Sequence, residues 1–126
     1  MFSPDDDYTS KPHRIEFKRL LSLPFCPPDE MTDDRQCVAY DQLRELFKDT
    51  DHLINGHTFT QHESPQEQAA NELRGRPCEW IPLLKLGWDN KVGFCFWDAG
   101  TLTFCIHQED LRRWDFSKVH VSLESS

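Results

Sequence analysis

Apolar residues alternate with polar ones, or run continuously, in several stretches of the second half of the chain, and this pattern predicts β-strands. The predicted strands cover residues 80–86, 92–97, 101–107 and 119–124. In the last of them Val119, Val121 and Leu123 alternate with polar neighbours, as in a strand with one buried face. A weaker alternation predicts a further strand within residues 14–23.

A helical period appears in residues 34–49, where Ala39, Leu43, Leu46 and Phe47 share one face. We expect this amphipathic helix to turn that face toward the core. Residues 51–62 show no period and predict a loop, whereas 109–114 predict one or two helical turns.

A second main helix is indicated by its end signals. Ser64 can cap its first amide groups, Pro65 suits the first turn, and Glu67 completes a capping box. Gly75 ends the helix, because glycine adopts the left-handed conformation that other residues avoid.

Residues 98–100 predict a three-residue hairpin loop with Gly100 in the left-handed conformation. This loop would place Phe96 opposite Leu102, Phe94 opposite Phe104 and Val92 opposite Ile106 on one face. A two-residue loop would break these apolar pairs, so the three-residue loop is preferred.

These elements predict an α+β fold, an antiparallel sheet of four to five strands with two main helices packed on it. The 126 residues suffice for one domain. Residues 1–13 are polar and acidic and are expected to form a flexible arm, which leaves residues 14–126 as a single domain.

The chain carries a net charge of −8 and has a pI of about 5.1. Nucleic acids and anionic membranes would repel this charge, so neither is an expected partner. A protein with a basic surface fits better, because complementary potentials speed encounter. The five cysteines match no zinc spacing, and the start of the chain does not resemble a signal peptide, so we expect a reducing, cytoplasmic location without disulfides.

Candidate chemistry is sparse. His52, His57 and His62 recur every five residues beside Glu63, and a curled loop could gather them around a metal. The spacing is not helical and no cysteine pattern supports it, so loop histidines with backbone hydrogen bonds are the preferred interpretation. No phosphate-binding glycine loop or other cofactor motif is present in the sequence.

Two cysteines, Cys95 and Cys105, are further candidates for chemistry. Cys95 and Cys105 are expected on the sheet face opposite the phenylalanine pairs, where diagonal neighbours could form a reactive pair. Inert, buried thiols are the preferred alternative.

Trp88 with Asp89, and Trp97 with Asp98, lie in or beside predicted turns. If exposed, each would offer an aromatic anchor next to a charge, a composition favoured in protein interfaces. These four residues are the candidate partner contacts, and packing of both indoles against the core is the alternative.

Three stretches carry a resemblance to a known family: HLINGHTFTQ at 52–61, WIPLLKL at 80–86 and GFCFWDAGTLTFCI at 93–106. They resemble the YwqG-like family, a bacterial family of undefined function. The resemblance covers residues 50–124, with a fainter similarity from 14 to 49, and so corresponds to the C-terminal half of the family. It implies an α+β fold with an antiparallel sheet and no established enzymatic activity. Half a sheet would expose an edge that residues 1–50, a partner or a second copy could cover.

The sequence therefore predicts a non-catalytic protein-binding module, most concretely an immunity-like protein that neutralises a toxin or another basic protein. One alternative is a metal-dependent or thiol enzyme that uses residues 52–63. Another is a family relic whose only role is self-association as a homodimer.

Overall fold

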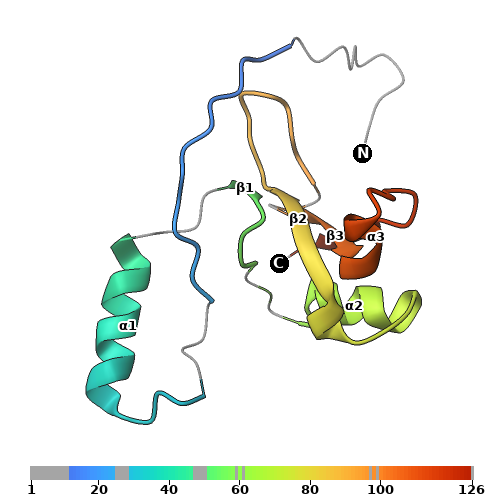
Figure 1. Cartoon of the computed structure of the whole chain (residues 1–126). Coiled ribbons are helices and arrows are strands. Elements are labelled where there is room, and N and C mark those ends of the chain that lie inside the picture. The colour runs from blue at the N-terminus through green and yellow to red at the C-terminus, as the bar shows by residue number, and fades with distance from the viewer. Residues whose placement is uncertain are drawn as a thin grey trace.

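A four-stranded antiparallel sheet organises the computed structural model, which describes residues 12–24, 29–46, 51–58, 60, 62–96, 98 and 100–125 (Figure 1). Its strands are β1 (His52–Ile54), β2 (Trp80–Leu86), β3 (Thr101–His107) and β4 (His120–Glu124), in the spatial order β1-β2-β3-β4. Three helices accompany it, α1 (Asp34–Leu46), α2 (Pro65–Glu72) and α3 (Gln108–Arg112), together with the short 3-10 helix η1 (Pro77–Glu79). The α+β fold with an antiparallel sheet is confirmed.

The predicted hairpin register is wrong, because β3 pairs with β2 instead of with residues 92–97. Leu102 lies opposite Leu86, Phe104 opposite Leu84 and Ile106 opposite Ile81. Residues 92–94 belong to a small turn that is closed by paired backbone hydrogen bonds between Asp89 and Phe94, and residues 95–96 have no regular structure. β2 and β3 are each seven residues long, so they offer a longer apolar pairing than the nearer segment does.

The left-handed glycine of this connection is Gly93, with φ of 75°, and not Gly100 as predicted. Gly100 is needed for a different reason. Its N–H donates to the carbonyl oxygen of Phe96 at 2.6 Å, and a Cβ atom there would collide with that oxygen and with the carbonyl oxygen of Glu124.

Two predictions for the first half of the chain are also wrong. Residues 52–54 were expected to be a loop, but they form β1 and pair with β2. Residues 14–23 were expected to form a strand, but they lie in a segment without regular structure, where Ile15 and Phe17 are exposed. Both segments depend on neighbours that are distant in sequence, which local alternation does not reveal.

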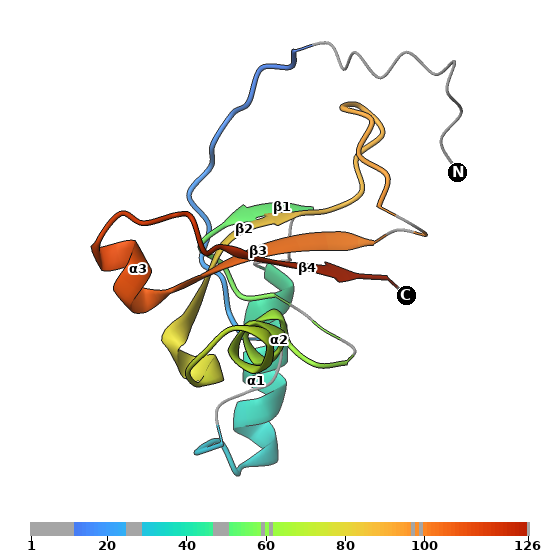
Figure 2. The ribbon, with the colours of Figure 1, turned by 90° about the vertical axis from the view of Figure 1, so that its right-hand side faces the viewer.

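α2 packs against one face of the sheet (Figure 2). The predicted capping box is present: Ser64 Oγ accepts from the Glu67 N–H, and the Ser64 N–H donates to Glu67 Oε2 at 2.7 Å. Gly75 has φ of 78°, as predicted. Ala69 of α2 forms the buried core with Trp80 and Cys105.

β4 presents its polar side to α2. His120 and Ser122 are buried, where His120 Nε2 lies 2.9 Å from Glu72 Oε2 and the Ser122 hydroxyl donates to Gln68 Oε1 at 2.7 Å. Val121 and Leu123 point the other way and are exposed. The alternation in β4 is therefore as predicted, but its apolar side is not the covered one.

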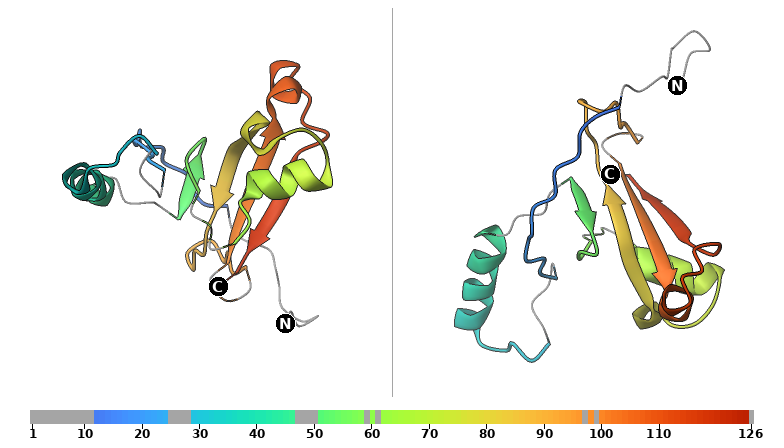
Figure 3. Two further views of the ribbon diagram at one scale, coloured as in Figure 1. Left: turned by 90° about the horizontal axis from the view of Figure 1, so that it is seen from below. Right: turned by 45° about the horizontal axis from the view of Figure 1, so that its top comes forward.

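α1 lies beyond the β1 edge of the sheet (Figure 3). Its existence is confirmed, but the predicted core face is wrong, because Leu43 and Leu46 are exposed. Tyr40 is its one buried residue, and the Tyr40 hydroxyl donates to the carbonyl oxygen of Pro24 at 2.7 Å. In the described part of the chain, no helix is long and apolar enough to cross a bilayer.

The capping box gives a stability prediction. Ser64→Ala removes the acceptor for the Glu67 N–H and is expected to lower the free energy of unfolding by about 1 kcal/mol. Urea denaturation measures this change. Ser125→Ala, at an exposed position next to the end of β4, is the control and should leave the value unchanged.

Candidate functional site

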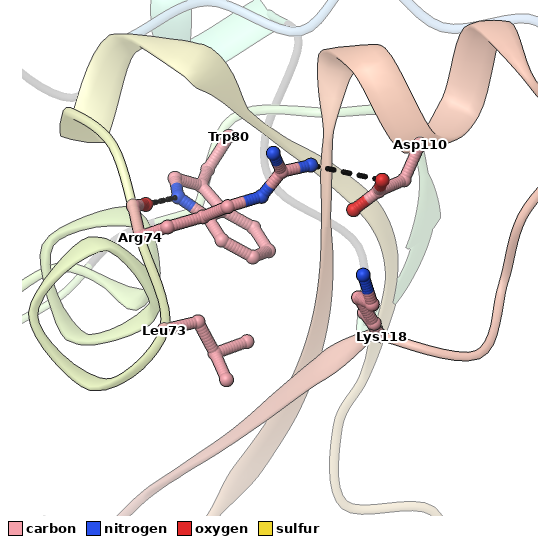
Figure 4. Close-up of a pocket in the computed structure, with 5 residues that line it drawn as sticks. All are labelled: Leu73, Arg74, Trp80, Asp110 and Lys118. Carbon is pink, nitrogen blue, oxygen red and sulfur yellow. Dashed lines mark hydrogen bonds and ion pairs between the residues drawn. The ribbon is translucent and has the colours of Figure 1, made fainter.

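A pocket of about 260 Å³ lies between the end of α2 and α3 (Figure 4). We call it the α2–α3 pocket. Its lining residues come from four places in the chain: Leu73 and Arg74 after α2, Trp80 at the start of β2, Asp110 in α3 and Lys118 before β4. The fold therefore brings together side chains that are up to 45 positions apart in the sequence, which no local pattern could indicate.

Asp110 is the buried charge of this pocket. Its side chain is only 5% exposed, and its Oδ1 accepts from Arg74 Nη2 at 2.9 Å. The other oxygen, Oδ2, is buried and has no hydrogen-bond partner within the described structure. Leaving such an acceptor unsatisfied costs about 1–3 kcal/mol, so this oxygen needs an explanation.

The other lining residues position the backbone of the pocket and contribute two positive charges to it. The Trp80 indole N–H donates to the carbonyl oxygen of Arg74 at 2.9 Å, which holds the backbone beside the pocket. Arg74 Nη1 also lies 3.4 Å from Glu109 Oε2. The hydrogen bond with Asp110 raises the pKa of the Arg74 guanidinium. Lys118 is exposed and makes no ion pair with any residue that the structure describes.

The turn after α3 carries an unusual exposed tryptophan. The N–H groups of Trp114 and Asp115 donate to the carbonyl oxygens of Leu111 and Asp110, which is the Schellman arrangement at a helix end. In this motif glycine is usual at the left-handed position, which Trp114 occupies here with φ of 56°. A bulky side chain in that conformation is costly. The Trp114 side chain is nevertheless 80% exposed, so packing within the chain does not account for it.

The surroundings of Trp114 are aromatic and basic. Its ring centroid lies 6.4 Å from that of Phe116, which is half exposed. Arg112 and Arg113 are exposed beside it in sequence. Tryptophan, phenylalanine and arginine are residue types enriched in protein interfaces. Sequence reasoning missed this site, because Trp114 lay in a predicted helical turn with no glycine to mark the motif.

The sheet face opposite α2 is apolar, and no described helix covers it (Figure 2). The strand register places its side chains together: Ile54, Leu84, Leu86, Leu102, Phe104, Val121 and Leu123. We call this surface the open face. Ile54, Val121 and Leu123 are exposed, and the other four are partly exposed.

The partner contacts predicted from sequence are distributed as follows. Trp88 is 47% exposed, and Asp98 is exposed. Asp89 has a structural role, because its carboxylate bonds to His52 and accepts from the Lys91 N–H at 2.9 Å. The hydrogen bond with His52 is the main reason why the pKa of Asp89 is lowered. Trp97 lies outside the described residues.

The histidine loop has a different arrangement from a metal site. His52 Nε2 lies 3.0 Å from Asp89 Oδ2, and His52 Nδ1 accepts from the Gly87 N–H at 3.3 Å. His57 is exposed and joins Ser22 through its backbone N–H, and His62 is exposed. Among the described residues, no three potential ligands gather around one point.

The two thiols are separated rather than paired. Cys105 is fully buried beneath α2, and burial raises the pKa of its thiol to about 11. Cys95 is exposed, and neither cysteine forms a disulfide bond. A reactive Cys95–Cys105 pair is therefore not formed, since the hairpin that would have brought them together does not exist.

The model of one family, described as a domain of unknown function (DUF1963), matches residues 4–124. This match takes in the first fifty residues, where the sequence showed only a faint resemblance. No curated protein matches the chain.

Thiol burial predicts a labelling order. A maleimide reagent at pH 8 should modify Cys78 and Cys95 quickly, because both residues are exposed and the reagent can reach them. Cys105 should react only after denaturation, because its thiol is buried and remains protonated. Mass spectrometry of tryptic peptides measures the order, and equal native labelling of Cys105 would contradict it.

Proposed function

The chain belongs to the DUF1963 family, and we propose that it acts as a non-catalytic protein-binding module. The specific YwqG-like identity is part of this proposal, as is a cytoplasmic, bacterial setting. None of the four described cysteines forms a disulfide bond.

Trp114 is the observation that carries the proposal. A glycine at this position would relieve the backbone, and the indole packs against little besides Phe116. The sequence therefore keeps a large aromatic side chain where it weakens the fold and faces water. Contact with another molecule accounts for both properties, since strained positions are retained at binding sites.

The open face supports the same conclusion. Apolar side chains are exposed on the open face and on α1, including Leu46, which is 78% exposed. Contiguous apolar surface of this kind marks interaction sites in soluble proteins.

An immunity-like role against a basic partner is the finer form of the proposal. The net charge of −8 supplies long-range attraction for such a partner. Exposed acidic residues gather near the start of α1, where Asp33 and Asp34 follow Asp29 and Glu30. The Trp114 end carries Arg112 and Arg113 instead, so we expect it to contact a more acidic segment of the same partner.

Trp114→Gly tests the module directly. We expect its free energy of unfolding to equal that of the wild type or to exceed it by up to about 1 kcal/mol, because glycine tolerates the left-handed position. A stoichiometric partner recovered with the tagged wild type should be lost with this variant. Phe17→Ala, which removes another exposed aromatic ring, should retain the partner.

Equal recovery with Trp114→Gly would remove Trp114 from the interface. Trp88→Ala then tests the contact that was predicted from sequence, and sedimentation of the bait alone tests whether a second copy covers the open face.

Charge steering gives a separate prediction for the immunity-like form. Asp34→Asn should slow association with the recovered partner more than Glu16→Gln does, because Asp34 lies in the acidic group at α1. Stopped-flow measurements at increasing salt check this. The difference between the variants should vanish near 1 M salt, where the Debye length is about 3 Å. Equal rates at low salt would exclude steering by α1.

A further inference from the structure

We propose that the α2–α3 pocket binds a small zwitterion of the size of an amino acid. The inference is independent of the proposed protein-binding role. It rests on two charges of opposite sign that the described residues leave incompletely paired: the buried Oδ2 of Asp110 and the Lys118 ammonium group.

Asp110 defines one end of the ligand. A carboxylate oxygen accepts hydrogen bonds and donates none, so a group that pairs with Oδ2 must be a donor. The Asp110 side chain points into the space between Arg74, Trp80 and Lys118 (Figure 4). Its other oxygen already holds Arg74 at 2.9 Å, which keeps the carboxylate in place. A ligand ammonium group matches this acceptor in charge and geometry.

Lys118 defines the other end. Its ammonium group points toward the Asp110 carboxylate and carries no ion pair within the described structure (Figure 4). Arg74 is shared with Asp110 and Glu109, so Lys118 is the lining cation left for an anionic group. A ligand carboxylate would form an ion pair with the Lys118 ammonium group.

Size and shape restrict the ligand further. About 260 Å³ is slightly below the roughly 300–1,000 Å³ typical of small-ligand sites. Leu73 and the indole of Trp80 supply apolar wall beside the charged groups. A molecule with an ammonium group, a carboxylate and a short aliphatic part satisfies all of these surfaces.

Entry requires only side-chain motion. Arg74 is 44% exposed, and Lys118 is exposed, so both can move aside at the pocket mouth. The alternative to a ligand is that water, or Lys118 after a change of rotamer, donates the missing hydrogen bond to Asp110 Oδ2. In that case L-leucine does not bind to the pocket.

Three probes test the inference on the full chain. L-Leucine has both charges, 3-methylbutylamine lacks the carboxylate, and 4-methylpentanoate lacks the ammonium group. Calorimetric titration, together with the NMR shift of the Trp80 indole N–H, should show L-leucine binding at least tenfold tighter than either analogue. No binding of L-leucine at millimolar concentration, or equal binding of all three, would overturn the proposal.

Two variants assign the ends. Lys118→Met alters an exposed side chain, so folding is preserved, and it should weaken L-leucine at least tenfold while leaving 3-methylbutylamine unchanged. Asp110→Asn keeps the shape of the side chain and should weaken L-leucine and 3-methylbutylamine, but not 4-methylpentanoate. An unaltered affinity for L-leucine in Lys118→Met would overturn the assignment even if Asp110→Asn failed to fold.

Discussion

The arrangement of the sheet, α2 and the pocket depends on the indole of Trp80. It packs against Ala69 of α2 and Cys105 of β3, and its N–H group holds the carbonyl oxygen of Arg74. Its ring also meets the His107 ring edge to face, with centroids 5.4 Å apart. One side chain thus fixes where α2 ends, where β2 begins and where Arg74 faces Asp110. The loss of so large a buried ring would remove the core and the pocket wall together.

This contact also explains why the sheet has two different faces. On the α2 side, small or polar residues allow the helix to approach, and Glu72 and Gln68 form hydrogen bonds with His120 Nε2 and with the Ser122 hydroxyl. Those hydrogen bonds specify how α2 lies on β4. The larger aliphatic side chains are left on the opposite face, because a strand that buries His120 must turn Val121 outward.

Local signals explain which parts of the fold could be predicted from sequence. Ser64, Glu67 and Gly75 act within one turn of the helix that they delimit, and α2 was predicted well. The residues of β2 and β3 were also predicted, because their composition is strongly strand-like. Their pairing was not, since two apolar strands competed for β3 and only tertiary contacts decide between them.

The site was harder to predict than the fold. The α2–α3 pocket joins residues from Leu73 to Lys118 through tertiary packing, so no spacing in the sequence marks it. The left-handed conformation of Trp114 could not be predicted for another reason. Trp114 occupies the position where a glycine would have indicated the end of α3. The histidine spacing suggested a cluster, but β1 formation directs His52 toward Asp89. Side chains in loops and at strand ends depend most on partners that are distant in sequence.

The acidic charge and the open face are consistent with each other. An apolar sheet face in water invites association with any similar surface, and identical chains would meet first. At a net charge of −8, two copies repel one another, so charge opposes the self-association that the open face favours. A partner of opposite charge meets no such barrier and gains the same apolar contact. Under the proposed protein-binding role, this balance favours a different protein over a second copy as the partner for the open face.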